Sequence, residues 1–242
     1  LRAEALLRRG GYDVDVALLY NTLSFDLAGT LSEAVDRAAG RYEIQAMGQG
    51  SRIANRLRYR GVRLAGRWVP LESMSWFDVA GRQSRTELKY DHARRTVEYR
   101  YRGETFLLRR QRVVDDLVSI PEGLHVDDVV SAILNYADGV WQPRADGTYH
   151  TVVARRRRSE SEGPDDVQQH YQAELVPFIM RVGRDAETGK PAASFDLTRF
   201  SSWARQSKPA RIVFDADRRP QLIAASLILG TSVSIRFTNA SS

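Results

Sequence analysis

The stretch Thr96-Val97-Glu98-Tyr99-Arg100-Tyr101-Arg102 alternates apolar and charged side chains along most of its length. Successive side chains of a β-strand point to opposite faces, so this pattern predicts a strand with one dry face and one wet face. The same two-residue period recurs in residues 42–46, 57–60, 88–90 and 233–237. Sheets built from such strands curve around an apolar interior, and what fills that interior becomes the functional question.

Turn residues separate a regular series of such segments. The predicted strands of the first half are residues 12–20, 23–34, 41–47, 53–64, 74–79, 82–90, 96–101 and 105–109. Those of the second half are residues 149–155, 168–181, 194–200, 210–215, 221–229 and 232–238. Residues 1–9 are read as a short amphipathic helix or frayed arm that ends at Gly10-Gly11. We expect an N-terminal arm over residues 1–11 and a single β-rich domain over residues 12–240.

One segment has a different period. From Val126 the apolar positions follow the three-and-four spacing of a helix face as far as Val140, with Asp127 and Asp128 at its start and Gly139 near its end. The expected fold is therefore mainly β, a strongly curved antiparallel sheet forming an incomplete barrel, with one internal helix.

Composition limits the class of protein. The chain has 242 residues and no cysteine, which excludes disulfides, thiolate catalysis and thiolate metal sites. No run approaches the roughly 18 consecutive apolar residues of a membrane-spanning helix, so a soluble protein is expected. The first residue is Leu1, and either a cleaved secretion signal or a trimmed chain explains that start.

The net charge of +6 comes almost entirely from arginine, because Lys89, Lys190 and Lys208 are the only lysines. Arginine binds phosphate bidentately, although a GC-rich coding sequence produces the same bias. The densest cluster, Arg155, Arg156, Arg157 and Arg158, is a candidate anion-binding site or the solvated tip of a hairpin. Nucleic-acid binding is not expected, since no stacking pair or reading motif accompanies the cluster.

Catalytic signals are weak. The four histidines are scattered, no nucleophile elbow or phosphate-binding glycine loop occurs, and the paired aspartates suit turns or helix starts better than acid–base work. We therefore predict a protein that is not an enzyme, with no metal and no cofactor.

Aromatic residues lie in or beside the predicted strands, and on alternate positions they would face a shared interior. They form either a packed core or the wall of an apolar pocket closed by the predicted helix. The candidate pocket residues are Trp68, Trp76, Tyr99, Tyr101, Phe106, Ile133, Tyr136, Phe178, Phe195, Trp203 and Phe214.

Four segments together resemble a bacterial exported family known as domain-of-unknown-function family 3108. They are the Tyr12-Asp13-Val14 strand, the Arg41-Tyr42-Glu43-Ile44 strand, the helix that begins at Val126, and the turn over residues 214–220 before a final hairpin. The chain is also similar to the half-open barrels that carry lipoproteins or lipids across the periplasm. The resemblance implies an envelope location and an apolar ligand, and it supplies no catalytic residues. The loop 156–166 and the insertion 185–191 depart from it.

The sequence thus favours a non-enzymatic periplasmic carrier or sensor that binds a lipid-like apolar ligand in the concave face of the sheet. An anionic membrane surface or an envelope protein is the expected further partner. The alternative is a cell-envelope interaction scaffold whose core is filled.

Overall fold

A computed structural model describes residues 6–18, 23–105, 108–159, 162–163, 165–200, 204, 208–227 and 230–239. Its elements in chain order are β1 (Leu6–Leu18), β2 (Leu23–Asp36), β3 (Arg41–Gly50), β4 (Ile53–Leu64), β5 (Arg67–Val79), β6 (Arg82–Asp91), β7 (Thr96–Glu104), β8 (Gln111–Ser119), α1 (Val129–Ala137), β9 (Thr148–Arg156), β10 (Ala173–Arg184), β11 (Pro191–Phe195), β12 (Ala210–Phe214), β13 (Pro220–Ser226) and β14 (Ser232–Asn239).

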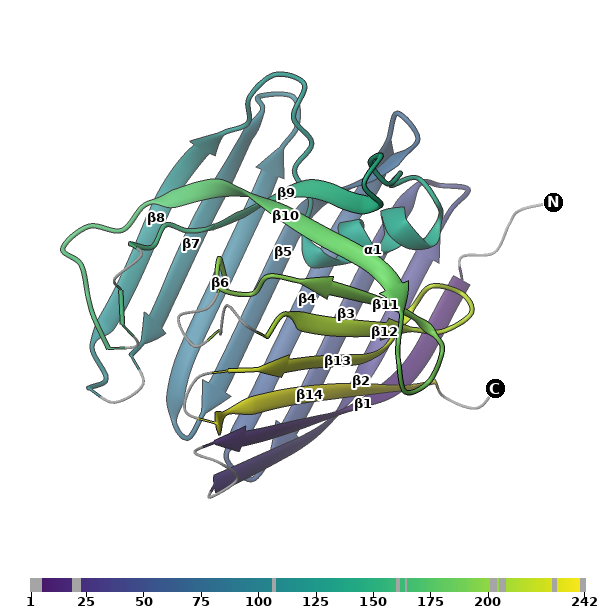
Figure 1. The fold of residues 1–242 in the computed structure, drawn as a ribbon. Coiled ribbons are helices and arrows are strands. Elements are labelled where there is room, and N and C mark those ends of the chain that lie inside the picture. Colours follow the sequence, from purple (N-terminus) through teal and green to yellow (C-terminus); the bar gives the residue numbers. More distant parts are fainter. Residues whose placement is uncertain are drawn as a thin grey trace.

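The fourteen strands of the described residues form one antiparallel sheet, in the spatial order β8 to β1 followed by β14 to β9. The first and last strands are therefore neighbours, and the sheet has two free edges, β8 and β9. Figure 1 shows the β9–β10 ribbon crossing over β5 to β8. The sheet is nearly closed into a barrel with one helix inside, which confirms the predicted fold class.

The alternation at residues 96–102 forms β7 as predicted. Val97 and Tyr99 are buried while Arg100 is exposed. Cross-strand pairing places Tyr99 opposite Leu88 and Val97 opposite Tyr90, so the apolar side chains of β6 and β7 share the inner face.

The two edges of the sheet overlap rather than pair. Val152, Ala154 and Leu175, from β9 and β10, pack against the buried inner face of β6 to β8. The opposite face of the same ribbon carries Tyr149 and Phe178 toward α1 and β12. We call this overlap of β7–β8 with β9–β10 the seam of the barrel.

The helix begins with a capping box. The Asp128 carboxylate accepts a hydrogen bond from the Ser131 backbone N–H, and the Ser131 hydroxyl in turn contacts the Asp128 backbone N–H. Inside the barrel, the Asn135 side chain satisfies both backbone polar groups of Trp68 in β5. It accepts a hydrogen bond from the Trp68 N–H at 2.9 Å and donates one to the Trp68 carbonyl at 2.8 Å. These bonds fix the helix against β5.

Two predictions of local structure are wrong. Residues 6–11 belong to β1 and pair with β2, and Gly10 and Gly11 also pair with β14, so this range forms no helix or frayed arm; residues 1–5 lie outside the described part. Of the predicted strand 105–109, Thr105, Leu108 and Arg109 are not in a strand, and residues 106 and 107 lie outside the described part. The strand in this region is β8, which the sequence pattern does not predict. In β8 the usual polarity is broken, because Arg112 is buried beside Val114 on the inner face while Val113 and Leu117 are exposed on the outer face.

Candidate functional site

Two cavities flank α1 inside the barrel. The first cavity, of about 380 Å³, lies between the helix, β4 to β6 and the β9–β13 region. The second cavity, of about 470 Å³, lies between the helix and β1 to β5, β13 and β14. Tyr59, Val129, Ile133 and Ile223 line both of them. The helix thus divides the interior space rather than filling it.

Aromatic side chains form much of the wall of the first cavity. The rings of Tyr136 and Phe214 are 4.9 Å apart, and those of Phe178 and Phe195 are 5.1 Å apart. Trp141 lies 6.4 Å from Phe178, and its indole N–H donates to the His150 carbonyl at 2.9 Å. The polar group of Trp141 is therefore satisfied by the protein, and its rings are left to form apolar wall.

The structure brings five of the predicted pocket residues together at the first cavity. They are Ile133, Tyr136, Phe178, Phe195 and Phe214. They come from α1, β10, β11 and β12, which are distant in the sequence. Phe106 and Trp203 lie outside the described residues.

Three further predicted residues face the interior but are packed core. Trp68 is fully buried and meets Tyr42 edge to face at 5.8 Å. Tyr99 and Tyr101 pack at the seam, and burial raises the pKa of Tyr99 to about 12. None of the three lines either cavity.

Trp76 lies on the outer face of the sheet, so the prediction that it faces the interior is wrong. It pairs with Arg56, whose guanidinium lies 5.6 Å from its ring centroid. The reason is a β-bulge: Gly61 pairs with Pro70 and Arg60 with Glu72, which leaves Leu71 as an extra residue. The bulge reverses the alternation, so Trp68 points inward and Trp76, eight residues later, points outward.

A polar wall, formed by Asp127, Asp128, Tyr59, Tyr90 and Ser73, bounds one part of the first cavity. Asp127 is fully buried and saturated with partners: its carboxylate contacts Arg67 and Thr151, and accepts from Ser131 at 3.1 Å and from Asn135 at 3.3 Å. Asp127 therefore links β5, β9 and α1: it forms an ion pair with Arg67, and both of its carboxylate oxygens have hydrogen-bond partners.

Asp128 differs from its neighbour. One carboxylate oxygen caps the helix, and the other, Oδ2, is buried with no hydrogen-bond partner among the described residues. Burial raises the pKa of Asp128 to about 7, which places its titration in the neutral range.

Sequence reasoning assigned Asp127 and Asp128 to the helix start and did not place them in a site. A usable signal was present, because Asp127, Ser131 and Asn135 recur every four residues on a helix whose neighbouring positions are apolar. A polar stripe on the inner side of a helix indicates buried partners. Tyr59 and Tyr90 carried no comparable signal.

The second cavity has its own polar groups. The Tyr12 hydroxyl donates to Asn55 Oδ1 at 2.7 Å. Glu33 is buried, and one of its carboxylate oxygens pairs with Arg219. The other carboxylate oxygen of Glu33, Oε1, is buried with no hydrogen-bond partner among the described residues. The rest of this wall is mainly aliphatic.

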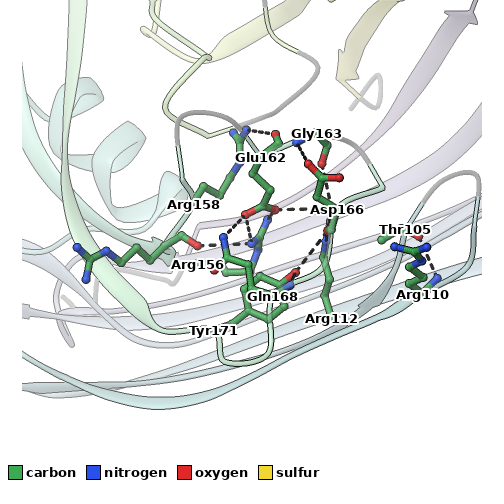
Figure 2. A network of polar contacts seen from close by, with 11 residues as sticks. Thr105, Arg110, Arg112, Arg156, Arg158, Glu162, Gly163, Asp166, Gln168 and Tyr171 are labelled. Carbon is green, nitrogen blue, oxygen red and sulfur yellow. Dashed lines mark hydrogen bonds and ion pairs between the residues drawn. The ribbon is translucent and has the colours of Figure 1, made fainter.

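The arginine cluster is largely committed to intramolecular contacts. Arg155 binds Glu174 at 2.6 Å and Arg156 binds Glu162 at 2.6 Å. Figure 2 shows Glu162 reaching Arg156, with the Arg112 guanidinium beside it and bound to the carbonyls of Gly163 and Asp166. Arg158 contacts backbone carbonyls at 3.5 Å, and Arg157 is exposed. Two of the four candidate anion ligands are thus already paired with carboxylates.

Among the described residues, no cluster of histidine, aspartate and glutamate side chains has the arrangement of a metal site. The helix of the described chain is too short to cross a membrane.

Neither the protein-family models nor the curated proteins contain a match to this chain. Among solved structures, it is similar to the crystal structure of a beta-barrel-like protein of the domain of unknown function DUF1849 from Brucella abortus, at 10% identity and a TM-score of 0.45. The alignment covers 97% of each chain. Membership in family 3108 stays a prediction.

Proposed function

We propose that this protein is a non-enzymatic carrier or sensor that binds a lipid-like apolar ligand inside the barrel, beside α1. The observation that carries the proposal is the unfilled space on both sides of the helix, with cavities of about 380 and 470 Å³. Ligand pockets in proteins occupy roughly 300 to 1,000 Å³ and have mainly apolar walls with a few polar groups.

Burial of apolar ligand surface would supply the affinity, at about 25 cal/mol per Å² before the entropic cost of binding. The aromatic rings in this wall already lie in two contacting pairs, Tyr136 with Phe214 and Phe178 with Phe195. A wall that is ordered before binding lowers that entropic cost. A filled scaffold would offer no such surface.

The first experiment is a titration with N-phenyl-1-naphthylamine, an uncharged dye whose fluorescence rises in apolar surroundings. We expect saturable binding. Ala132→Phe inserts a ring into the first cavity and Ala46→Phe does the same in the second, so each should weaken binding at its own cavity by about tenfold or more. The double variant should abolish binding.

Leu117→Phe is the matched control, because Leu117 is 64% exposed on the outer face of β8. It should bind the dye like the unaltered protein. Circular dichroism checks that each variant is folded, and Ser75→Phe replaces Ala132→Phe if that variant unfolds. No dye binding by the folded protein, and no lipid recovered by native mass spectrometry, would favour the interaction scaffold instead.

The periplasmic location is a further part of the proposal. It is supported by the resemblance to exported envelope proteins and by the net charge of +6, which attracts anionic membrane surfaces. Arg157 is the exposed member of the arginine cluster that such a surface would meet. Cell fractionation of the natural gene product tests the location, and recovery in the cytoplasm would contradict it.

A further inference from the structure

The charged residues around the second cavity gather at one end of it. Within the described part of the chain, the charged residues that line this cavity are Arg8, Arg9, Glu33 and Arg219. Arg8 of β1 lies directly opposite Glu33 of β2. Glu33 in turn binds Arg219, which immediately precedes β13. The four residues therefore share one end of the cavity, which we call the arginine end.

The rest of the wall becomes apolar with distance from the arginine end. Along the inner face of β1, Arg8 is followed by Gly10, Tyr12, Val14 and Val16, all of which line the cavity. Eight residues of strand separate Arg8 from Val16, a distance of about 26 Å. The far end is lined by apolar side chains from β2, β4 and β14, namely Leu27, Ile53 and Val233. The lining is therefore elongated, with its charges at one end.

Arg8 is a cation on the inner face that has no carboxylate of its own. Its side chain is half-buried, and it forms no ion pair or hydrogen bond with the rest of the described chain. Glu33, its neighbour across the strands, is paired with Arg219. Arg9 is exposed, and as the next residue of the strand it points to the outer face of the sheet. The inner side of the arginine end therefore carries one net positive charge.

This charge selects the head group that fits. A guanidinium group binds a carboxylate or phosphate through two parallel hydrogen bonds, and these bonds are stronger where water is partly excluded. One unpaired guanidinium matches a single negative charge. A cationic head group would be repelled by Arg8, and it would find no free acceptor on Glu33, because one carboxylate oxygen is bound to Arg219 and the other is buried.

We propose that the second cavity binds an apolar chain that ends in a singly charged anionic head group, such as a carboxylate. Arg8 binds the head group, and the chain extends along β1 toward Val16. This inference rests on the proposed function and names the head group and its place in the barrel. Burial of the chain supplies most of the affinity, while Arg8 fixes the orientation.

The test is displacement of N-phenyl-1-naphthylamine by decanoic acid, 1-decanol and decylamine at about pH 8, where the carboxyl group of decanoic acid is ionised. All forms carry Ala132→Phe, or Ser75→Phe if that variant unfolds, so that the dye reports on the second cavity. Arg8→Gln removes the charge, and Arg8→Lys keeps it. Arg102→Gln is the matched control, because it removes the same charge from an exposed position of β7 that lines neither cavity.

The expected results separate the head group from the chain. Arg8→Gln should bind decanoic acid about fivefold or more weakly than the form with Arg8 does, because the charged hydrogen bonds are lost. Arg8→Lys should lie between these two forms, and Arg102→Gln should bind like the form with Arg8. Binding of 1-decanol should change little in any of them. Circular dichroism checks folding, and Arg8→Met replaces Arg8→Gln if that variant unfolds.

Other results overturn the inference. Equal binding of decanoic acid by the forms with and without Arg8 would remove the head-group site and leave the apolar cavity in place. Tighter binding of decylamine than of decanoic acid would show that the arginine end selects a cation. Dye binding that is lost when the first cavity is filled would show that the second cavity takes no ligand. Failure of the dye to bind any folded form, including the unaltered protein, would overturn the proposed function itself.

Discussion

Two adjacent carboxyl groups in this protein have opposite environments. Asp127 shares its charge with Arg67 and three further polar partners, whereas Asp128 caps the helix with one oxygen and has no hydrogen-bond partner on the other within the described part of the chain. Asp127 precedes the helix and Asp128 is its N-cap in an extended conformation, so the two neighbouring side chains meet different partners.

Stability should therefore depend on pH through Asp128. Burial raises its pKa from 3.8 to about 7, so the folded protein binds this proton more tightly than the unfolded chain does. The stabilisation is complete below the unfolded pKa and is lost as the pH rises through the folded pKa. Relative to the unaltered protein, Asp128→Asn should gain stability between about pH 5 and about pH 8, by up to about 1.4 kcal/mol per pH unit.

Urea unfolding of the unaltered protein and of Asp128→Asn, at about pH 5 and about pH 8, measures the difference between their free energies of unfolding. The comparison cancels the titration of groups that both proteins share. An identical stability difference at both pH values would contradict the raised pKa.

At the scale of elements, the seam is held by charge as well as by packing. Arg112 from β8 and Arg156 from β9 meet at Glu162, whose side chain is 1% exposed (Figure 2). The contact joins the two edge strands of the sheet, which share no backbone pairing in the strand ladder. The buried carboxylate therefore acts as a tie across the seam.

Glu162→Gln should open the seam. The variant removes the negative charge that two buried guanidinium groups share, and loss of one partner of a buried ion pair costs about 3 to 5 kcal/mol. Hydrogen exchange should become faster in β8 and β9, while β2 to β4 should change little. Glu174→Gln, which removes the partly exposed partner of Arg155, is the control and should cost less than about 1 kcal/mol. Uniformly faster exchange in all strands would show that the seam has no local role.

At the scale of the whole molecule, the sheet is held together by a pairing between its first and last strands. β1 pairs with β14 from Gly10 opposite Asn239 to Ala17 opposite Ser232. Val233, Ile235 and Phe237 of β14 pack with the buried residues of β1 to β3 around the second cavity. Neither half of the sheet is complete until the C-terminal strand is in place.

Truncation after Gly230 should therefore prevent folding of the barrel. The deletion removes the only strand that joins β1 to β13 in the described sheet, and it exposes the apolar faces of both. A truncation after Asn239 keeps all of β14 and serves as the control. Near-UV circular dichroism, which reports the packed tryptophans, should be lost in the first protein and retained in the second. A native signal from the shorter chain would show that the two halves fold independently.

Local pattern predicted most of the elements because a strand face and a helix face are properties of neighbouring residues. The alternation at residues 96–102 and the capped helix after Asp128 needed no information from elsewhere in the chain. β8 was missed because its inner face carries Arg112 and Asp116, which bind the segment 162–173. Trp76 was misplaced because one extra residue at Leu71 reverses the alternation, and the sequence does not mark the bulge.

The sequence by itself determined a curved antiparallel sheet with an internal helix and an apolar interior, since side-chain period and capping chemistry act over a few residues. Only the tertiary structure decided that the interior holds two cavities, that Arg155 and Arg156 are paired, and that one oxygen of Asp128 is buried without a hydrogen-bond partner among the described residues. Volume, ion pairing and burial arise between segments far apart in the chain. No local pattern encodes them, because each depends on which surfaces meet when the sheet closes.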